Sequence, residues 1–206
     1  MGVVRETLIL VSNQKTADEY LAKTYPIKDV NPTTGKVRQY RTPVYKIFVK
    51  GTDGTSKPLV KEWTGLRFMP YWNDPKHPDG RYKTLGWVNS GKHRVTKQPV
   101  TYYNRDYPIH NRISPFHGAI TIDGSFLIHA GPADLSDTQW GAAGCVEVIG
   151  DFDAFKNDIK EVSGATAANL DDAILETIKA QKLLIEVEQA EPPDFKKMFD
   201  GEADDR

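Results

Sequence analysis

The sequence predicts a mainly β protein of the α+β class, with two helices packed late in the chain. Two hairpin patterns indicate a sheet, because in each of them two strand-like runs flank a turn. Helical periodicity is clear only after residue 151. A chain of 206 residues fits one domain. We expect a single domain over residues 1–190 and an acidic, flexible tail over residues 191–206.

Strands dominate the N-terminal part of the chain. Residues 3–11 predict a strand, whereas residues 16–23 predict a short helix. Residues 44–49 alternate between apolar and polar side chains, and a turn-rich segment follows them. Residues 59–63 then have the pattern of a second strand that runs back along the first. This pattern predicts the first hairpin.

The middle of the chain combines loops with a second hairpin. Residues 64–115 contain many turn residues and aromatic residues but no helical period, which indicates short strands and long loops. Residues 119–122 and 125–129 then flank Asp123-Gly124, a dipeptide typical of tight hairpin turns.

A strand and a helix are predicted next. Residues 146–149 have the apolar character of a strand. Apolar residues recur at helical spacing over residues 152–162, with Asp151 or Asp153 as the N-cap. Gly164 is typical of a helix end.

The remaining elements close the predicted domain. A second apolar stripe over residues 170–178 predicts a helix that begins after Asn169. Residues 183–188 predict a last strand. The acidic segment 191–206 contains two adjacent prolines, which favours a mobile tail.

Composition narrows the classes of partner. The formal net charge is −1, so charge gives no reason to expect nucleic acid or an anionic membrane surface as a partner. The N-terminal apolar run, residues 8–11, is too short for a signal peptide or a membrane span. We therefore expect no membrane span and no classical export signal. The single cysteine excludes an internal disulfide.

Cys145 and His129 are the candidate catalytic residues. His129 ends an apolar run, and a loop of small and polar residues separates it from Cys145, the only cysteine. A thiol beside an imidazole suffices for nucleophilic catalysis, because the imidazole accepts the thiol proton. Gly144 allows close approach of the backbone. The main-chain N–H groups of Gly144 and Cys145 could then form an oxyanion hole.

Two other interpretations of these residues stay open. A lone cysteine between glycine and valine is often a small buried apolar residue. His117, His129, Asp134 and Cys145 could converge on a metal ion, but the sequence has no closely spaced pair of ligands, which disfavours zinc. We expect neither a metal nor a cofactor.

Around these residues the chain resembles the L,D-transpeptidase catalytic domain, also called the YkuD-like fold. The signature of that family is His-Gly, a loop, and Ser-X-Gly-Cys-Ile/Val-Arg, to which residues 128–131 and 142–148 correspond here. Weaker likenesses lie at residues 78–82 and 115–119. The resemblance covers about residues 40–150, and only the part with the histidine and the cysteine is specific.

The resemblance implies a β-sandwich-like domain that acts on peptidoglycan stem peptides in the bacterial periplasm or cell wall. Cys145 would attack the carbonyl between a diamino acid and a terminal D-amino acid, with His129 as general base and later as acid. The acyl group would pass to an amine, in cross-linking or D-amino-acid exchange, or to water, in L,D-carboxypeptidase activity.

Four departures from the signature indicate a divergent member. The glycine after the histidine is Ala130, the two residues before Gly-Cys are Ala142 and Ala143, and the arginine is Glu147. A carboxylate cannot supply the guanidinium fork that would hold an anionic substrate. By analogy, divergent members without an export signal include antibacterial effectors, whose partners are a secretion machinery and an immunity protein.

Substrate-binding candidates lie around the predicted pair. His117 is either a second imidazole in the groove or an exposed loop residue, and Trp140 is either a groove wall or a loop anchor. Arg112 or Arg94 could replace the missing arginine. Ala143 is the last substrate-binding candidate, next to Gly144.

Two alternative functions remain. The first is a non-catalytic module that binds the cell wall or a protein partner on the same fold, in which Cys145 is unreactive. The second is a different cysteine hydrolase, such as a peptidoglycan amidase. The order of residues disfavours the amidase, because many amidases place the cysteine first, whereas no histidine follows Cys145.

Overall fold

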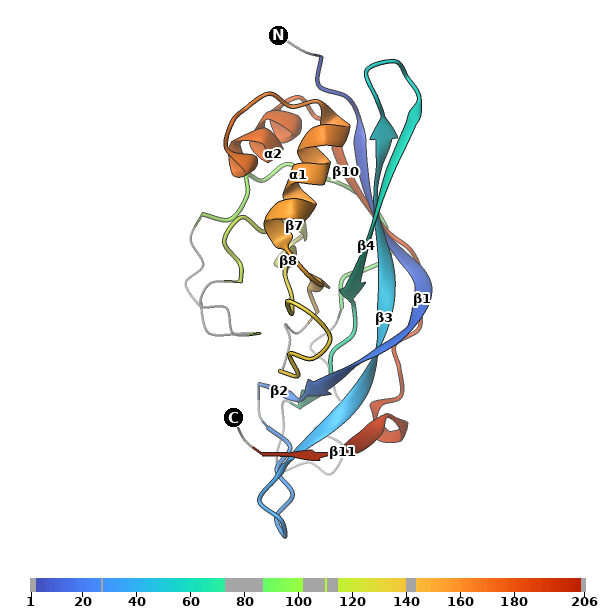
Figure 1. Cartoon of the computed structure of the whole chain (residues 1–206), viewed down its shortest axis with the longest axis vertical. Coiled ribbons are helices and arrows are strands. Elements are labelled where there is room, and N and C mark those ends of the chain that lie inside the picture. The colour runs from blue at the N-terminus through green and yellow to red at the C-terminus, as the bar shows by residue number, and fades with distance from the viewer. Residues whose placement is uncertain are drawn as a thin grey trace.

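The structure is a computed structural model that describes residues 3–26, 28–72, 87–101, 110, 115–139 and 144–204. Most described residues with regular structure lie in strands, which confirms the mainly β class (Figure 1). The described strands are β1 (Thr7–Lys23), β2 (Tyr25–Pro26), β3 (Val37–Thr52), β4 (Pro58–Leu66), β5 (Tyr71–Trp72), β6 (Gly91–Arg94), β7 (Ile120–Asp123), β8 (Phe126–Ala130), β9 (Val146–Val148), β10 (Leu183–Val187) and β11 (Phe199–Ala203).

The strands form one large mixed sheet and one small pair. The order in the large sheet is β6-β10-β1-β3-β4-β9-β8-β7, and β11 pairs with the first residues of β3. In this sheet β1–β10 and β8–β9 are parallel pairs. Because β6 and β7, at the two ends of the order, contact each other, the sheet is nearly closed. β2 and β5 form the separate pair.

Both predicted hairpins are confirmed. β3 and β4 pair antiparallel across a turn in which the Asp53 carboxylate accepts the backbone N–H groups of Thr55 and Lys57. β7 and β8 pair antiparallel across Asp123-Gly124, and Gly124 has a φ of 54°, which glycine adopts without strain. The strands predicted at residues 146–149 and 183–188 are confirmed as β9 and β10.

The short helix predicted at residues 16–23 is wrong, because this segment is the second half of β1. Residues 19–23 pair with β3 after two irregularities in the register. Tyr20 and Ala22 are fully buried. A helix of two turns is marginal without tertiary support, whereas the strand gains backbone hydrogen bonds and buries both side chains.

The two predicted helices are confirmed as α1 (Phe152–Ser163) and α2 (Leu170–Lys179). Asp151 caps α1 by accepting the N–H groups of Asp153 and Ala154. Gly164 ends α1 in the left-handed conformation with a φ of 69°, and Asn169 caps α2. Figure 1 shows both helices together on one side of the curved sheet. None of the described helices is long and apolar enough to cross a membrane.

The helices cover the main core. Apolar side chains of α1 and α2 pack there against one face of the sheet, which we call the helix face, and its fully buried members include Ile47, Val49, Ile128, Val146, Val148, Phe155, Ile159 and Ile174. We call the opposite face of β4, β9 and β8 the site face.

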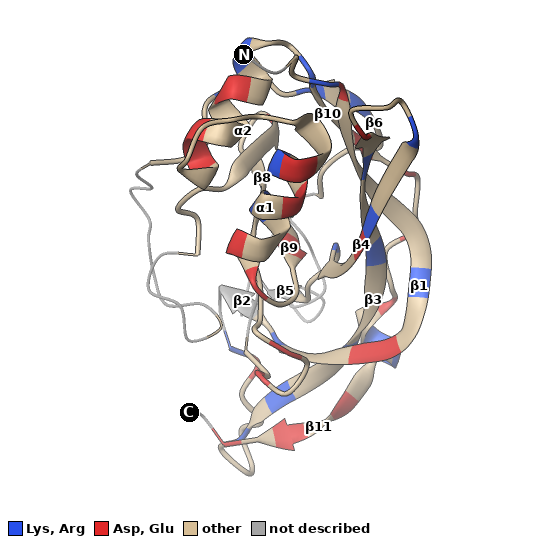
Figure 2. Cartoon of the chain, turned by 45° about the horizontal axis from the view of Figure 1, so that its top comes forward, with Lys and Arg blue, Asp and Glu red and all other residues tan. Residues whose placement is uncertain are grey.

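Figure 2 shows acidic residues on α1, α2 and β11 and basic residues along β3 and β4.

The acidic C-terminal segment differs from the predicted flexible tail. It contains a short 3₁₀ helix, η2 (Phe195–Lys197), and β11, which pairs antiparallel with β3. Phe195 is buried in a cluster with Tyr40, Tyr45 and Phe68. One apolar anchor and one strand pairing therefore outweigh a composition that by itself favours mobility.

Candidate active site

The candidate residues lie on the site face of β8 and β9. Side chains alternate between the two faces of a strand. Ile128, Ala130, Val146 and Val148 point to the helix face, where they join the main core. The alternation places four side chains on the other face: Leu127, His129, Cys145 and Glu147.

The pairing of β8 with β9 brings Cys145 and His129 to one region. The register aligns His129 with Glu147 and Ile128 with Val146, so Cys145 lies beside Leu127. The Leu127 N–H donates to the Cys145 Sγ at 3.4 Å. This offset separates the α-carbons of Cys145 and His129 by about 8 Å. No hydrogen bond joins these two described side chains.

His129 is arranged as a neutral base. Its side chain is completely buried, and Nδ1 lies 2.8 Å from the Ala130 carbonyl oxygen, which can only accept. Nδ1 therefore carries the proton, and Nε2 is a buried nitrogen with no hydrogen-bond partner. Burial, opposed by the charge of Glu147, lowers the pKa of His129. Phe116 contacts the ring at a centroid distance of 4.8 Å.

Cys145 is arranged as a protonated thiol. It is partly exposed and packs against the apolar cluster of Phe116, Ala119 and Leu127. Burial of the sulfur, followed by the nearby charge of Glu147, raises the pKa of the Cys145 thiol to about 11, although the Leu127 N–H opposes this shift. The resting pair is thus a thiol and a neutral imidazole, not a thiolate and an imidazolium.

Glu147 links His129 to a second histidine. The Glu147 carboxylate is fully buried, with Oε2 3.0 Å from His110 Nε2 and Oε1 3.9 Å from His129 Nε2. His110 Nδ1 lies 3.1 Å from the Tyr20 hydroxyl. We call these four buried residues, Tyr20, His110, Glu147 and His129, the Glu147 network.

His129 is the only member of this network that the sequence singles out as a candidate catalytic residue. His110 lies in a segment predicted as loop, and Tyr20 lies in the segment predicted as helix, so no local pattern marks either residue. Glu147 does have a local signal, because a carboxylate between two valines of a short strand is unusual. The sequence could therefore have indicated that Glu147 is buried, but it could not have indicated which residues contact it.

The loop after β8 covers the network. The Tyr20 hydroxyl lies 2.6 Å from the Asp137 carbonyl oxygen and 2.9 Å from the Gln139 backbone nitrogen. The loop leaves β8 at Gly131, where an added Cβ would lie 2.7 Å from the Val148 carbonyl oxygen, so only glycine fits this close approach. Tyr20 on β1 therefore fixes the loop that follows the candidate base.

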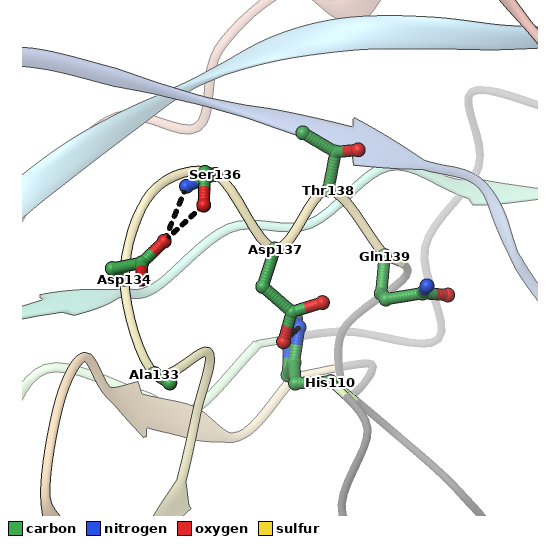
Figure 3. A pocket seen from close by; sticks show the side chains of 7 residues that line it. All are labelled: His110, Ala133, Asp134, Ser136, Asp137, Thr138 and Gln139. Carbon is green, nitrogen blue, oxygen red and sulfur yellow. Dashed lines mark hydrogen bonds and ion pairs between the residues drawn. The ribbon is translucent and has the colours of Figure 1, made fainter.

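An open pocket of about 640 Å³ reaches the network at His110 (Figure 3). Its described walls are His110, Ala133, Asp134, Ser136, Asp137, Thr138 and Gln139. Figure 3 shows the Asp137 side chain next to the His110 ring, and one carboxylate oxygen lies 4.0 Å from Nδ1. Most of the described residues that line the pocket are polar, and His110 is the one that joins it to the Glu147 network.

Gly144, predicted to help form an oxyanion hole, has a left-handed backbone. Its φ is 85°, a conformation that favours glycine. Its carbonyl oxygen accepts the Val88 N–H at 3.2 Å, which ties the turn before Cys145 to another segment. Trp140, Arg112 and Ala143, predicted to bind substrate, lie outside the described residues.

Two other predicted residues lie away from the Glu147 network. His117 is exposed on a turn whose next residue, Gly118, lies against Lys156 and Asp171 of the helices. Arg94, on β6, donates to the Gln181 carbonyl oxygen. Among the described residues, no group of three or more His, Cys, Asp or Glu side chains is placed to hold a metal ion.

Comparison of the chain with known proteins finds no matching family model, no matching curated protein and no matching solved structure. The functional assignment therefore depends on the residues of the site face and on the resemblance at residues 128–131 and 142–148.

Proposed function

We propose that the protein catalyses cysteine-dependent acyl transfer on peptidoglycan stem peptides, as an L,D-transpeptidase or L,D-carboxypeptidase with the β-sandwich-like fold of that family. One observation carries the proposal. The only thiol and an imidazole with a free Nε2 project from the same face of two directly paired strands. The match of the surrounding residues to the family signature supplies the substrate class.

The resting protonation states suit general-base catalysis. As the Cys145 sulfur attacks the stem-peptide carbonyl carbon, its proton passes to His129 Nε2. The C–N bond then breaks, Nε2 returns the proton to the departing D-amino acid, and a thioester remains on Cys145. An amine or water next attacks the thioester while Nε2 accepts its proton, and the sulfur leaves as the restored thiol.

The step requires Sγ and Nε2 to approach each other when substrate binds. Catalytic hydrogen bonds are often long in free enzymes and shorten in the complex. The Ala130 carbonyl keeps the imidazole in the tautomer that leaves Nε2 free. The N–H groups of Gly144 and Cys145 would receive the developing oxyanion, a contribution of about 10²–10³-fold where it has been measured in other enzymes.

The test is mass spectrometry of purified muropeptides with a tetrapeptide stem after incubation with the protein. Loss of the terminal D-amino acid, its exchange or a cross-linked dimer identifies water, a free D-amino acid or a second stem as acceptor. We expect Cys145→Ala to reduce the rate by at least about 10³-fold. His129→Ala should reduce it strongly, whereas His93→Ala, on β6 and outside the Glu147 network, should not. A fully active Cys145→Ala variant would refute the proposal.

A second candidate function is a non-catalytic module that binds cell wall or a protein partner. The raised pKa of the Cys145 thiol and the missing Cys145–His129 hydrogen bond favour it. In that case the protein sediments with insoluble peptidoglycan, or with its partner, equally well with Cys145→Ala, and no muropeptide changes mass.

The proposed role as an exported effector places the activity in the bacterial periplasm. Fusion to a periplasmic signal should make expression toxic to a bacterium, whereas expression in the cytoplasm should not. The Cys145→Ala form of the same fusion is the control and should be harmless. If both forms were equally toxic, the toxicity would not result from acyl transfer by Cys145.

A further inference from the structure

We infer that Glu147 is a positioning residue that holds its charge beside His129 Nε2, and that His110 and Tyr20 hold Glu147 in place. The catalytic role of Glu147 rests on the proposed function, whereas its position next to His129 does not. The residue occupies the position where the similar family carries arginine. The buried face behind the candidate base therefore carries a carboxyl group rather than a guanidinium group in this chain.

Burial makes the placement of Glu147 specific. A carboxylate removed from water is costly unless hydrogen bonds and opposite charge compensate. Glu147 is completely buried, and its two oxygens face different imidazoles, His110 at 3.0 Å and His129 at 3.9 Å. The shorter contact fixes the carboxylate, and the longer one sets its second oxygen opposite Nε2.

The hydrogen bonds of Tyr20 determine how His110 is oriented. The hydroxyl has a single proton, and its shortest contact is with the Asp137 carbonyl oxygen, at 2.6 Å. The Tyr20 hydroxyl oxygen accepts the Gln139 N–H at 2.9 Å, and the hydroxyl also lies 3.1 Å from His110 Nδ1. Because a carboxylate can only accept, His110 donates from Nε2–H to Glu147, while Tyr20 contacts Nδ1 on the other side of the ring.

This arrangement gives Glu147 a role only when His129 becomes charged. The proton accepted from Cys145 would reside on Nε2, 3.9 Å from the Glu147 Oε1. The carboxylate then stabilises the imidazolium and raises the basicity of His129 against the opposing effect of burial. Among the described residues, the other titratable groups that face this pair are Cys145, His110 and, beyond His110, Tyr20 and Asp137.

The test is the titration of His129 by NMR in the folded protein, with its signal assigned by loss in His129→Gln. In Glu147→Gln, which keeps shape and hydrogen bonding, we expect the pKa of His129 to fall by about 1 unit or more, since an opposite charge at this distance is removed. Asp29→Asn is the matched control, because Asp29 is another buried carboxylate and accepts from the Tyr40 hydroxyl. It should leave His129 unchanged.

Turnover supplies the second measurement. In Glu147→Gln, muropeptide processing should fall about 10-fold or more. The acid limb of its pH profile should move to lower pH, which simple loss of stability would not produce. Tyr20→Phe, which removes one hydroxyl, should lower the pKa of His129 and the rate of muropeptide processing, each by less than Glu147→Gln does. If Glu147→Gln does not fold, Tyr20→Phe takes its place in the test.

The outcomes separate the two proposals. An unchanged His129 titration in folded Glu147→Gln, or in folded Tyr20→Phe where Glu147→Gln does not fold, overturns this inference, even if Cys145 proves essential for turnover. A wild-type protein that leaves muropeptides unchanged overturns the proposed function, while the NMR titration still decides the role of Glu147.

Discussion

The chemistry of single residues in this site is set by burial more than by charge pairing. Desolvation raises the pKa of the Cys145 thiol and lowers the pKa of His129, so both groups are neutral near pH 7. A neutral pair attacks through general-base catalysis, whereas a preformed thiolate would need a nearby cation. The reactivity of the free thiol therefore reports the resting state directly.

We predict that iodoacetamide alkylates Cys145 slowly at neutral pH. The rate should rise about tenfold per pH unit between about pH 7 and pH 10, because only the thiolate reacts and its fraction grows toward the pKa of about 11. Cys145 is the only cysteine, so intact mass measures its labelling without background. His129→Gln should not slow the reaction. Fast labelling that is already constant near pH 7, and that His129→Gln slows, would contradict the neutral pair.

The two candidate catalytic residues were predictable from the sequence, but their partners were not. Cys145 and His129 stand out because one is unique and both adjoin strand-like runs. His110 and Tyr20 reach the site from far along the chain, 37 and 127 residues before Glu147. Contacts of that kind depend on how strands pair, which no local pattern specifies.

At the scale of elements, the β4–β9 pairing positions the site face. Gly65 and Leu66 pair with Val148 and Glu147, and this contact holds the strand that carries the carboxylate. An added Cβ at Gly65 would collide with the Glu147 carbonyl oxygen and with Ile47. The absence of a side chain at Gly65 thus allows the two strands to lie this close together.

We predict that Gly65→Ala destabilises the protein by about 2 kcal/mol, because the backbone of β9 must shift to admit a methyl group. Urea denaturation followed by circular dichroism measures the change in the free energy of unfolding. Gly54→Ala is the control, since its added Cβ meets no atom within 4 Å, and it should change stability by no more than about 0.5 kcal/mol. Equal stability of the two variants would contradict the close β4–β9 approach.

Helices and hairpins were predictable as elements, while the second half of β1 was not. Caps at Asp151, Asn169 and Gly164 define α1 and α2 locally, and the Asp123-Gly124 turn defines a hairpin. Residues 16–23 have no such local signal, and the partner strand β3 decides their conformation. The same pairing places Tyr20 where it can hold His110.

At the scale of the whole molecule, the C-terminal segment completes a second apolar cluster. Phe195 packs with Phe68 and with Tyr40 and Tyr45, which lie in the first half of β3. This cluster is separate from the main core under the helices. β11 then adds a strand to the start of β3 (Figure 1). The last described residues therefore belong to the folded domain.

We predict that Phe195→Ala lowers the free energy of unfolding by about 3 kcal/mol, because it removes a buried aromatic ring and leaves a cavity. Phe199→Ala, four residues later, should cost much less, because the Phe199 side chain is 45% exposed. Thermal or urea unfolding of both variants measures the difference. If the two substitutions lower the free energy of unfolding by the same amount, the buried ring of Phe195 does not anchor the C-terminal segment to the domain.

The sequence by itself determined the class of the protein, its two helices with their caps, its two hairpins and the choice of Cys145 and His129 as candidates. These features depend on periodicity, turn chemistry and residue type, which are local. Only the tertiary structure decided that β8 and β9 pair in parallel, that His129 and Cys145 share one face, and that Glu147, His110 and Tyr20 lie next to His129. The physical reason is that burial and strand pairing join distant segments, and both set the protonation states on which the chemistry depends.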